Sequence, residues 1–485
     1  MNPSEAFSEA LTCFRAGNAE AALSLCDDLI AVVPSEPGIW HLAGLAAFSL
    51  RRFAAAAHYF DRARALEPAN PAHAINLANA LIKLDRDAEA EGALQTALAL
   101  DPRSSDAEIA LGIVARRAGH LEDAVLHADC AIASRPDSYP AWVNRGRALH
   151  ELGRFDAAIQ SYERAVAIDP QAAPAHAQMA LSLLLTGDFE RGWREYAWRG
   201  EGSDLVSRGR FDRLEWQGEP LNGATLLVHA EQSLGDTIQF ARFLPMAEAR
   251  GACVVLEVQP ELKRLFAGFS SSTVAVARGE PLPPFQQHIR LMSLPRALGT
   301  GLDTIPPPLR FRPPPASGDR IVPPADRRMT VGLNWAGRPT HENDRNRSIA
   351  PELLAPLGDV AGIRWVSVQK DRPGIMPDFI ELDLGPRLHD LADLAEAMQG
   401  LDLLITIDSA PAHLMGSLGR PVWVLLPDPP DWRWLLGRDD SPWYPTARLF
   451  RQGERGHWAD VIERVGTALD ALRDEKAVSP PPGLD

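Results

Sequence analysis

The chain has 485 residues, of which 46% are hydrophobic and 23% charged, so it is typical of a soluble globular protein with several domains. Its formal net charge of −15 argues against non-specific binding to nucleic acid or anionic membranes. Four cysteines without metal-ligand spacing indicate a reducing compartment. The first residues show no basic and apolar leader pattern, and no apolar run reaches about 18 residues, so we expect no secretion signal and a cytoplasmic protein without a membrane partner.

Prolines recur every 34 residues in the first part of the chain, at Pro34, Pro68, Pro102, Pro136 and Pro170. This period is typical of tetratricopeptide repeats, in which each unit is a helical hairpin that buries its apolar face against its neighbours. Each proline should end the second helix of its unit, because proline lacks an N–H and disfavours helix in the residue before it. The predicted units are 3–34, 37–68, 71–102, 105–136 and 139–170, and we assign residues 1–172 to five repeats.

Small and large residues alternate within these units in a fixed order. The second unit reads Trp40, Ala43, Gly44, Ala47, Ala56, Phe60, Ala63 and Pro68, and it resembles the tetratricopeptide repeat at nearly every signature position. A sixth unit begins near Ala173 but loses its closing proline and runs into the aromatic, charged stretch from Trp193 to Arg199. We expect residues 173–214 to be a degenerate repeat followed by a helix that couples the array to the next domain.

Three amides occupy the sixth position of the first helix in their units: Asn76, Asn144 and Gln178. In a repeat array that helix lines the concave face, where an amide can bond to the backbone of an extended peptide. We therefore predict a groove that binds a protein client. The alternative is that these amides only bridge neighbouring repeats or face water.

Beyond about Glu215 the pattern becomes that of an α/β protein. Apolar runs predict strands at 225–229 and 253–258, with a helix from Thr237 to Arg250 between them. After a proline-rich stretch at 312–328, which we interpret as a linker, strands are expected at 329–334, 364–368, 403–407 and 422–426. Residues 215–311 and 329–476 should thus be two Rossmann-like, doubly wound domains with a ligand cleft between them, and residues 477–485 a disordered tail.

The segment from Asp408 to His413 (DSAPAH) joins a predicted strand to a predicted helix. Ser409 or Asp408 can cap that helix, and Pro411 suits its first turn. The helix N-terminus, including Ala410, would then present N–H groups to a phosphate, with His413 as a further donor. An ordinary helix cap with a packed histidine is the alternative.

Two motifs in this half resemble those of the bacterial heptosyltransferases. They are Ser233 to Asp236 (SLGD), before a helix that carries Pro245, and Ile407 to Leu414 followed by Ser417 to Pro421, and the likeness covers roughly residues 220–470. The resemblance implies a GT-B glycosyltransferase fold, an inverting reaction with a nucleotide-activated sugar, and Asp236 as the catalytic base. A carboxylate in that role would take the proton of an acceptor hydroxyl. Taken alone, Asp236 would be interpreted as a helix cap, and it is the two motifs together that favour the catalytic role. The predicted fold class is therefore α plus α/β: a tetratricopeptide α-solenoid followed by a GT-B fold of two Rossmann-like, doubly wound domains.

The resemblance is incomplete at the phosphate site. The heptosyltransferase lysine has no clear counterpart, and Arg345 and Arg347 stand in that region, where they can clamp phosphate or belong to a charged solvent loop. Further candidates for the donor site are Asn334, Gln369 and Lys370. Gly235, Gln232, Trp432 and Trp434 are candidates for the acceptor or sugar pocket, although the two tryptophans can equally pack the hinge. The one Asp-x-Asp, at Asp85 to Asp87, lies in a repeat turn, so we expect no metal and no other cofactor.

Repeats joined to a GT-B module also resemble the O-linked N-acetylglucosamine transferases, in which the array presents protein acceptors. We therefore expect a protein O-glycosyltransferase that docks a client and transfers a sugar to serine or threonine hydroxyls. Flagellin is a candidate client, because the layout is similar to that of bacterial flagellin-modifying transferases. The alternatives are a non-catalytic adaptor with a degenerate transferase domain, and a lipopolysaccharide or exopolysaccharide transferase.

Overall fold

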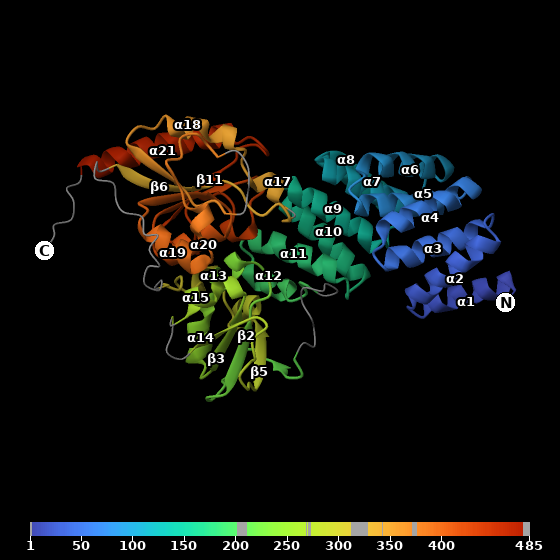
Figure 1. The fold of residues 1–485 in the computed structure, drawn as a ribbon, viewed down its shortest axis with the longest axis horizontal. Coiled ribbons are helices and arrows are strands. Elements are labelled where there is room, and N and C mark those ends of the chain that lie inside the picture. Colours follow the sequence, from blue (N-terminus) through green and yellow to red (C-terminus); the bar gives the residue numbers. More distant parts are fainter. Residues whose placement is uncertain are drawn as a thin grey trace. The chain divides into compact units, whose positions relative to one another are not determined.

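The computed structural model describes residues 2–200, 211–267, 269, 273–311, 328–341, 343–370 and 376–478. The chain divides into two compact units, Met1–Gln178 and Met179–Asp485 (Figure 1). The division falls inside the segment that was expected to be a degenerate sixth repeat. The predicted linker at 312–328 lies outside the described residues except for Arg328. The predicted tail at 477–485 does so from residue 479 onward, because the last helix reaches Val478.

Unit 1 is all helical and is built from consecutive helical hairpins (Figure 1). Its helices are α1 (Pro3–Arg15), α2 (Ala19–Val32), α3 (Pro37–Ser49), α4 (Phe53–Leu66), α5 (Pro71–Lys83), α6 (Asp87–Leu100), α7 (Ser105–Ala118), α8 (Leu121–Ser134), α9 (Tyr139–Glu151) and α10 (Phe155–Ile168), followed by the first turns of α11 (Ala173–Leu185). The five predicted repeats are thus the pairs α1–α2 to α9–α10.

The periodic prolines stand where the second helices end, as the sequence predicts. Each of these helices closes on a cap residue that directly precedes the proline; α2, for example, is capped by Val33 and followed by Pro34. Small signature residues let the paired helices approach closely. A Cβ at Gly44 would lie 2.6 Å from Cδ1 of Phe60, so only glycine fits against that ring.

Unit 2 contains two fully parallel sheets, each flanked by helices. In the first sheet the strand order is β1-β5-β2-β3-β4. Its strands are β1 (Leu214–Glu215), β2 (Thr225–His229), β3 (Cys253–Val258), β4 (Val274–Ala277) and β5 (Gln287–Arg290). Its α-helices are α13 (Leu234–Phe240), α14 (Leu244–Ala249), α15 (Lys263–Phe266) and α16 (Leu294–Ala297), and its 3₁₀ turns are η1 (Ala241–Phe243), η2 (Pro260–Leu262), η3 (Leu291–Ser293) and η4 (Leu302–Thr304).

The second sheet has the order β11-β10-β9-β6-β7-β8. Its strands are β6 (Met329–Asn334), β7 (Ile363–Ser367), β8 (Leu382–Asp383), β9 (Leu403–Ile407), β10 (Val422–Leu426) and β11 (Ala447–Arg451). Its α-helices are α17 (Asp344–Arg347), α18 (Ala355–Gly358), α19 (Leu391–Gln399), α20 (Ala410–Ser417) and α21 (Ala459–Val478), and its 3₁₀ turns are η5 (Pro351–Leu354), η6 (Gly385–Arg387) and η7 (Trp432–Trp434). The first strand of this sheet, β6, pairs with both β7 and β9, so the strand order reverses there. In open α/β sheets, ligands bind at the carboxyl ends of the strands at such a reversal.

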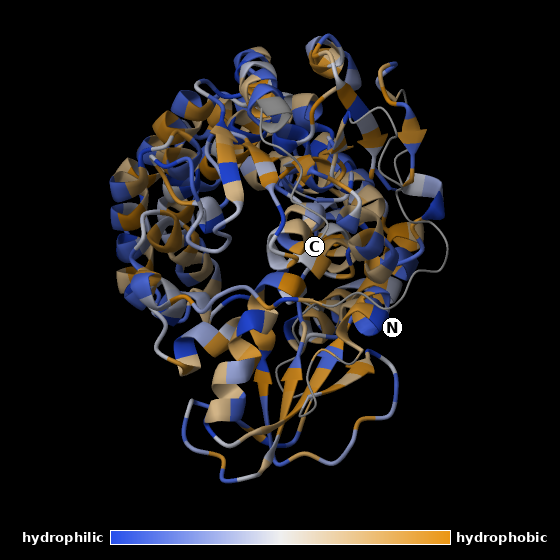
Figure 2. Cartoon of the chain, turned by 90° about the vertical axis from the view of Figure 1, so that its left-hand side faces the viewer, coloured by the Kyte–Doolittle hydropathy of each residue, from blue (hydrophilic) through white to orange (hydrophobic). Residues whose placement is uncertain are grey.

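Burial follows directly from this architecture. Strands covered by helices on both faces need apolar residues throughout, and β9 and β10 are buried along their whole length. The strands of unit 2 are accordingly mostly orange in the hydropathy view of Figure 2. The fold class is therefore a helical repeat region followed by an α/β region with parallel sheets.

Candidate functional site

Two short helices from different sheets of unit 2 meet at their N-termini. Helix α13 follows β2 of the first sheet, and α20 follows β9 of the second. Gly235 is in the first turn of α13, and a Cβ there would lie 3.3 Å from Cα of Ala410 and 2.8 Å from Cδ2 of His413. The absence of a side chain at Gly235 therefore permits this approach. It brings the two sequence motifs together at the carboxyl ends of both sheets.

Asp236 is held by two groups on its two oxygens. Its Oδ2 accepts the backbone N–H of Ser233 at 2.8 Å, and Ser233 caps α13 in return, which forms a capping box. Its Oδ1 accepts a hydrogen bond from the guanidinium of Arg433. The exposed fractions are only 13% for the Asp236 side chain and 9% for Arg433, so this pair is largely withdrawn from water.

Arg433 bonds through all three of its guanidinium nitrogens, and two of them reach residues of the first sheet's domain. Besides Asp236, it donates from Nε to Gln239 Oε1 at 2.7 Å and from Nη1 to Asp431 Oδ1 at 2.8 Å. Its guanidinium also lies 4.3 Å from the ring centroid of Trp432. The 3₁₀ turn η7, which belongs to the second sheet's domain, thus places the guanidinium of Arg433 beside Asp236, the predicted base in the first domain.

Asp408 lies beside this group at the end of β9. Burial, together with the negative charge of Asp431, raises the pKa of Asp408 to about 6, although the positive charges of Arg347 and Arg433 act in the opposite direction. A carboxyl group whose pKa lies near neutrality is typical of functional sites, especially where the strand order of a parallel sheet reverses. Such shifted pKa values also occur in structural charge networks. Asp236, Asp408 and Asp431 therefore form a cluster of carboxyls around Arg433.

The N-terminus of α20 is not capped in the way the sequence suggests. Ser409 occupies the cap position but makes no capping bond, because its hydroxyl donates instead to Oδ1 of Asn334 at 2.9 Å. Thr406 donates to the same oxygen at 3.0 Å, so Asn334 at the end of β6 ties down the turn after β9. Pro411 is in the first turn of α20, as expected.

Gln369 and Lys370 hold backbone in place. Gln369 accepts from the side chain of Asn334 at 2.9 Å and from the N–H of Ala336 at 2.9 Å, and its own amide donates to Ala336 O. Lys370 donates to the carbonyl of His389 at 3.1 Å. These contacts favour a structural role for both residues. A contact of either residue with a nucleotide-sugar remains a prediction.

The two predicted arginines differ in position. Arg347 is largely buried and donates from Nη1 to the backbone oxygen of Asp408 at 2.9 Å, so it lies at the turn between β9 and α20. Arg345, on the same helix α17, is exposed. Arg347 is therefore the better candidate for an anion ligand near Asp408.

The side chains of His413 and Trp434 are buried, and His413 also approaches Gly235 of the first domain. His413 is 5% exposed, bonds through Nδ1 to the hydroxyl of Tyr444 at 3.1 Å, and stacks on Trp434 at 5.6 Å between ring centroids. Burial, followed by the positive charges of Arg433 and Arg242, holds the pKa of His413 well below its usual value. The ring is therefore a neutral, interior group in this arrangement, and its role as a phosphate donor remains a prediction.

The prediction that Trp432 or Trp434 stacks on a sugar is corrected by their burial. Trp434 is 0% exposed and Trp432 is 3% exposed. Trp432 is enclosed by the rings of Trp193, Tyr196, Phe240 and Trp443. Neither ring face is open to a ligand, so both tryptophans pack the interior, which is the alternative that the sequence left open.

Three functional candidates were not predicted: Arg433, Asp431 and His341. The first two lie in the aromatic segment 428–434, where the tryptophans were the evident signal in the sequence. His341 lies in the loop between β6 and α17. Its pKa is lowered, first by loss of solvation and then by the charge of Arg347, although Asp431, Asp344 and Asp236 act in the opposite direction. The ion pair between Asp236 and Arg433 could not be inferred, because these residues are 197 positions apart.

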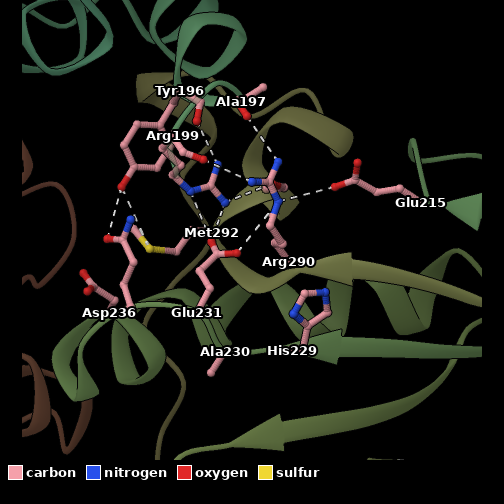
Figure 3. Close-up of polar contacts among 12 residues, drawn as sticks. Tyr196, Ala197, Arg199, Glu215, His229, Ala230, Glu231, Asp236, Arg290 and Met292 are labelled. Carbon is pink, nitrogen blue, oxygen red and sulfur yellow. Dashed lines mark hydrogen bonds and ion pairs between the residues drawn. The ribbon is translucent and has the colours of Figure 1, made fainter. Parts of the chain in front are cut away.

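Figure 3 shows the loop that precedes Asp236. Glu231, just after β2, is ion-paired with Arg199, and both side chains are almost fully buried. Gln232, a predicted pocket residue, is exposed; its side-chain oxygen accepts the hydroxyl of Tyr196 at 3.4 Å, and its carbonyl accepts Gln259 Nε2 at 2.7 Å. Gln232 is therefore on the loop beside Asp236, and its contact with an acceptor stays a prediction.

The predicted groove residues of the array are all half-buried on first helices. Asn76 on α5 lies 3.4 Å, through Nδ2, from Nε2 of His41 on α3. His41 in turn bonds to His73, which bonds to Glu67 at 2.8 Å. Asn76 thus takes part in a contact between neighbouring repeats. A peptide contact by Asn76, Asn144 or Gln178 stays a prediction.

Two absences within the described residues bear on metal binding and on membranes. In that part of the chain, no group of three or more His, Cys, Asp or Glu side chains is arranged to hold a metal ion. No helix there is long and apolar enough to cross a membrane.

Comparison with known families supports the assignment of tetratricopeptide repeats to the N-terminal region. The tetratricopeptide repeat family is matched twice, over residues 47–116 and 109–173. Together with the helical hairpins of unit 1, these matches show that this region is a tetratricopeptide array. Such arrays are protein-interaction scaffolds with an extended concave surface.

A curated relative, protein FlbA of Caulobacter vibrioides, is 27% identical over 331 residues. The match covers 60% of this chain and 54% of FlbA, so the chain spans about half the length of that relative.

Among solved structures, similar chains include a thermophilic tetratricopeptide protein of Thermus thermophilus, with 20% identity, a TM-score of 0.34, and coverage of 38% of this chain and all of that one. The type IV pilus biogenesis factor PilW has 18% identity and a TM-score of 0.37, covering 40% of this chain and 90% of its own. YrrB, a tetratricopeptide protein with an unusual peptide-binding site, has 20% identity and a TM-score of 0.30, with 35% and 88% covered. At these scores the likenesses add nothing to the fold described above.

Proposed function

We propose that this protein is a glycosyltransferase of the GT-B type that modifies a protein client held by its tetratricopeptide array. In this proposal the two parallel-sheet domains of unit 2 bind a nucleotide-activated sugar, and a serine or threonine hydroxyl of the client is the acceptor. The observation that carries the proposal is the meeting of α13 and α20, because it brings Asp236 beside the strand-order reversal of the second sheet.

The chemistry required is the removal of a proton from a weakly acidic hydroxyl. Asp236 would be the general base, and each oxygen of a carboxylate can accept more than one hydrogen bond. Ser233 and Arg433 can therefore orient Asp236 while an acceptor hydroxyl approaches the remaining lone pairs. This orientation would reduce the entropy cost of aligning base and acceptor.

Negative charge that develops on the leaving phosphate would be stabilised from the second sheet. The first turn of α20 has no side-chain cap, and Arg347 and Arg433 are the nearby cations. This is modest equipment for a phosphate, and it suits a donor with one phosphate better than a donor with two. No metal or other cofactor is part of the proposal.

The identity of the client rests on the resemblance to flagellin-modifying transferases, and we propose flagellin as the first candidate. The relative FlbA favours no particular client, because this chain spans only about half of its length. The array itself supports any client with an extended segment that fits its concave face.

A second candidate function is a non-catalytic adaptor. It is favoured by the engagement of both Asp236 oxygens, because a carboxylate paired with a buried arginine can serve structure alone. In that case the parallel-sheet domains would bind a ligand or only support the array.

The experiment is intact-mass analysis of proteins that co-purify with the chain from cells that produce it naturally. With the wild-type chain we expect a client that carries the added mass of one or more sugar residues. With Asp236→Asn, which preserves side-chain size and hydrogen bonding to Arg433, we expect the same client in similar amount but without added mass.

The matched control is Asp440→Asn, which removes an exposed carboxylate paired with Arg438 and should leave the modification unchanged. Modification that persists in Asp236→Asn would exclude Asp236 as the base. A wild-type chain whose bound proteins carry no added mass would favour the adaptor.

A further inference from the structure

The stretch from Trp193 to Arg199 contacts two separate loops of the candidate site. It comprises the end of α12 (Phe189–Tyr196) and the residues that follow it. One of these loops runs from Glu231 to Asp236 in the first domain, and the other contains Trp432 and Arg433 in the second. All of these residues belong to unit 2.

The contact with the first loop is a buried ion pair. Arg199 bonds through Nε to Glu231 Oε1 at 3.2 Å, and its Nη2 bonds to the same oxygen and to Ser293 Oγ at 3.0 Å. The exposed fractions of the two side chains are 6% and 3%. Arg290 lies 3.9 Å from the other oxygen of Glu231 and donates to the carbonyls of Ala197 and Arg199 (Figure 3).

The contact with the second loop is aromatic. Trp193 meets Trp432 edge to face at 5.4 Å between ring centroids, and Tyr196 lies 6.1 Å from the same ring. A further neighbour of Trp432 is the guanidinium of Arg433, which bonds to Asp236. The stretch is therefore connected to Asp236 by two sets of contacts. One passes through Glu231, which is close to Asp236 in sequence, and the other passes through Trp432 and Arg433.

We propose that the stretch from Trp193 to Arg199 positions the Asp236–Arg433 pair, with Arg199 and Trp193 as its positioning residues. The consequence for sugar transfer rests on the proposed function, whereas the positioning itself does not. Arg199 is suited to the role because its planar guanidinium makes several bonds in fixed directions to Glu231, Ser293 and the carbonyl of Tyr196. Glu231 precedes Asp236 by only five residues, so a shift of one displaces the other.

The test is the double variant Arg199→Met with Glu231→Leu. Replacing both charges by apolar residues of similar size leaves neither partner as an uncompensated buried charge, and Arg290 keeps Glu215 at 3.7 Å as an acidic partner, so the chain should still fold. The readout is hydrogen exchange of the amides of Ser233, Asp236 and Thr237, which are bonded within the capping turn. We expect these amides to exchange at least about tenfold faster, with exchange in β9 and β10 unchanged.

The matched control is Arg328→Met with Glu381→Leu, which removes a two-bond ion pair beside β8 in the other domain. It should leave exchange at 233–237 as in the wild type. Unchanged exchange at 233–237 in the first variant, or a uniform rise through all of unit 2, would overturn the proposal, because a merely structural pair would show no preference for this turn.

A second readout links positioning to transfer. In the Arg199→Met, Glu231→Leu variant, the rate of client modification should fall about 100-fold, as expected for a displaced reactive group, while the amount of client retained stays the same. A normal modification rate with accelerated exchange at 233–237 would overturn the role in catalysis. If the wild-type chain modifies no client, the proposed function fails and the exchange comparison alone decides the positioning.

Discussion

At the scale of single residues, Asp408 is a carboxyl group whose surroundings oppose its ionisation. Its folded pKa of about 6 lies above the usual value of 3.8 because of burial and the nearby charge of Asp431. The folded state therefore holds the proton more tightly than the unfolded state between about pH 4 and pH 6. It follows that stability decreases as the pH rises through this window and stays lowered above it.

The substitution Asp408→Asn removes the ionisable group, and with it the loss of stability that ionisation causes above about pH 6. We expect the variant to be more stable than the wild type near pH 7 by about 1–3 kcal/mol, with the difference vanishing near pH 4. Urea unfolding followed by tryptophan fluorescence measures it, since all tryptophans except Trp40 and Trp142 lie in unit 2. Asp440→Asn, at an exposed position, should shift stability by less than about 0.5 kcal/mol at either pH. A variant less stable than the wild type near pH 7 would contradict the assignment.

Residue-scale prediction from the sequence succeeded where local chemistry decides and failed where burial decides. Pro411 lies in the first turn of α20, as predicted, whereas Asp236 forms a capping box with Ser233 although the two motifs together favoured a catalytic role for it. Trp432 and Trp434 were ambiguous because an aromatic residue in a loop suits both a sugar platform and a core. The packing of residues from distant segments, such as Trp193, settled that question.

At the scale of elements, close approach of helices depends on glycines whose neighbours come from another helix. A Cβ at Gly146 on α9 would lie 2.7 Å from Cζ of Tyr162 on α10. Gly92, in the interior of α6, has nothing within 4 Å of the corresponding point. The same substitution should therefore have opposite effects at the two positions.

We expect Gly146→Ala to destabilise the array by about 1–3 kcal/mol, because the methyl group overpacks against the Tyr162 ring. Gly92→Ala should stabilise it by about 0.5–1 kcal/mol, because alanine has the higher helix propensity. Urea unfolding followed by helical circular dichroism measures both. Equal effects of the two variants would show that the crossing of α9 and α10 tolerates a side chain.

Element prediction from the sequence was most accurate for buried strands. The strands at 225–229, 253–258, 329–334, 403–407 and 422–426 coincide with β2, β3, β6, β9 and β10. The strand expected at 364–368 is β7 at Ile363–Ser367, and the expected helix 237–250 begins earlier, at Leu234, and is broken by η1. The edge strands β1, β4, β8 and β11 and the strand β5 were not predicted. Short strands and strands with polar residues, such as β5 (QHIR), carry a weak hydrophobic signal.

At the scale of the whole molecule, the two units are built on different physical principles. Each repeat of unit 1 contacts mainly its neighbours, whereas the sheets of unit 2 pair strands that are distant in sequence. We therefore expect unfolding that is not two-state, with different urea midpoints for helical circular dichroism and for tryptophan fluorescence. Gly146→Ala should move the first midpoint and leave the second unchanged. Superimposable curves in the wild type would contradict two independent transitions.

The sequence by itself determined the repeat array, because a 34-residue period with helix-ending prolines is a local pattern repeated along the chain. It also determined the buried parallel strands and the motif after β2, since these depend on near neighbours. Only the tertiary structure decided the pairing of Asp236 with Arg433, the raised pKa of Asp408 and the burial of His413, Trp432 and Trp434. These properties depend on contacts between side chains that are distant in sequence, because such contacts determine how far each group is buried and which charges surround it.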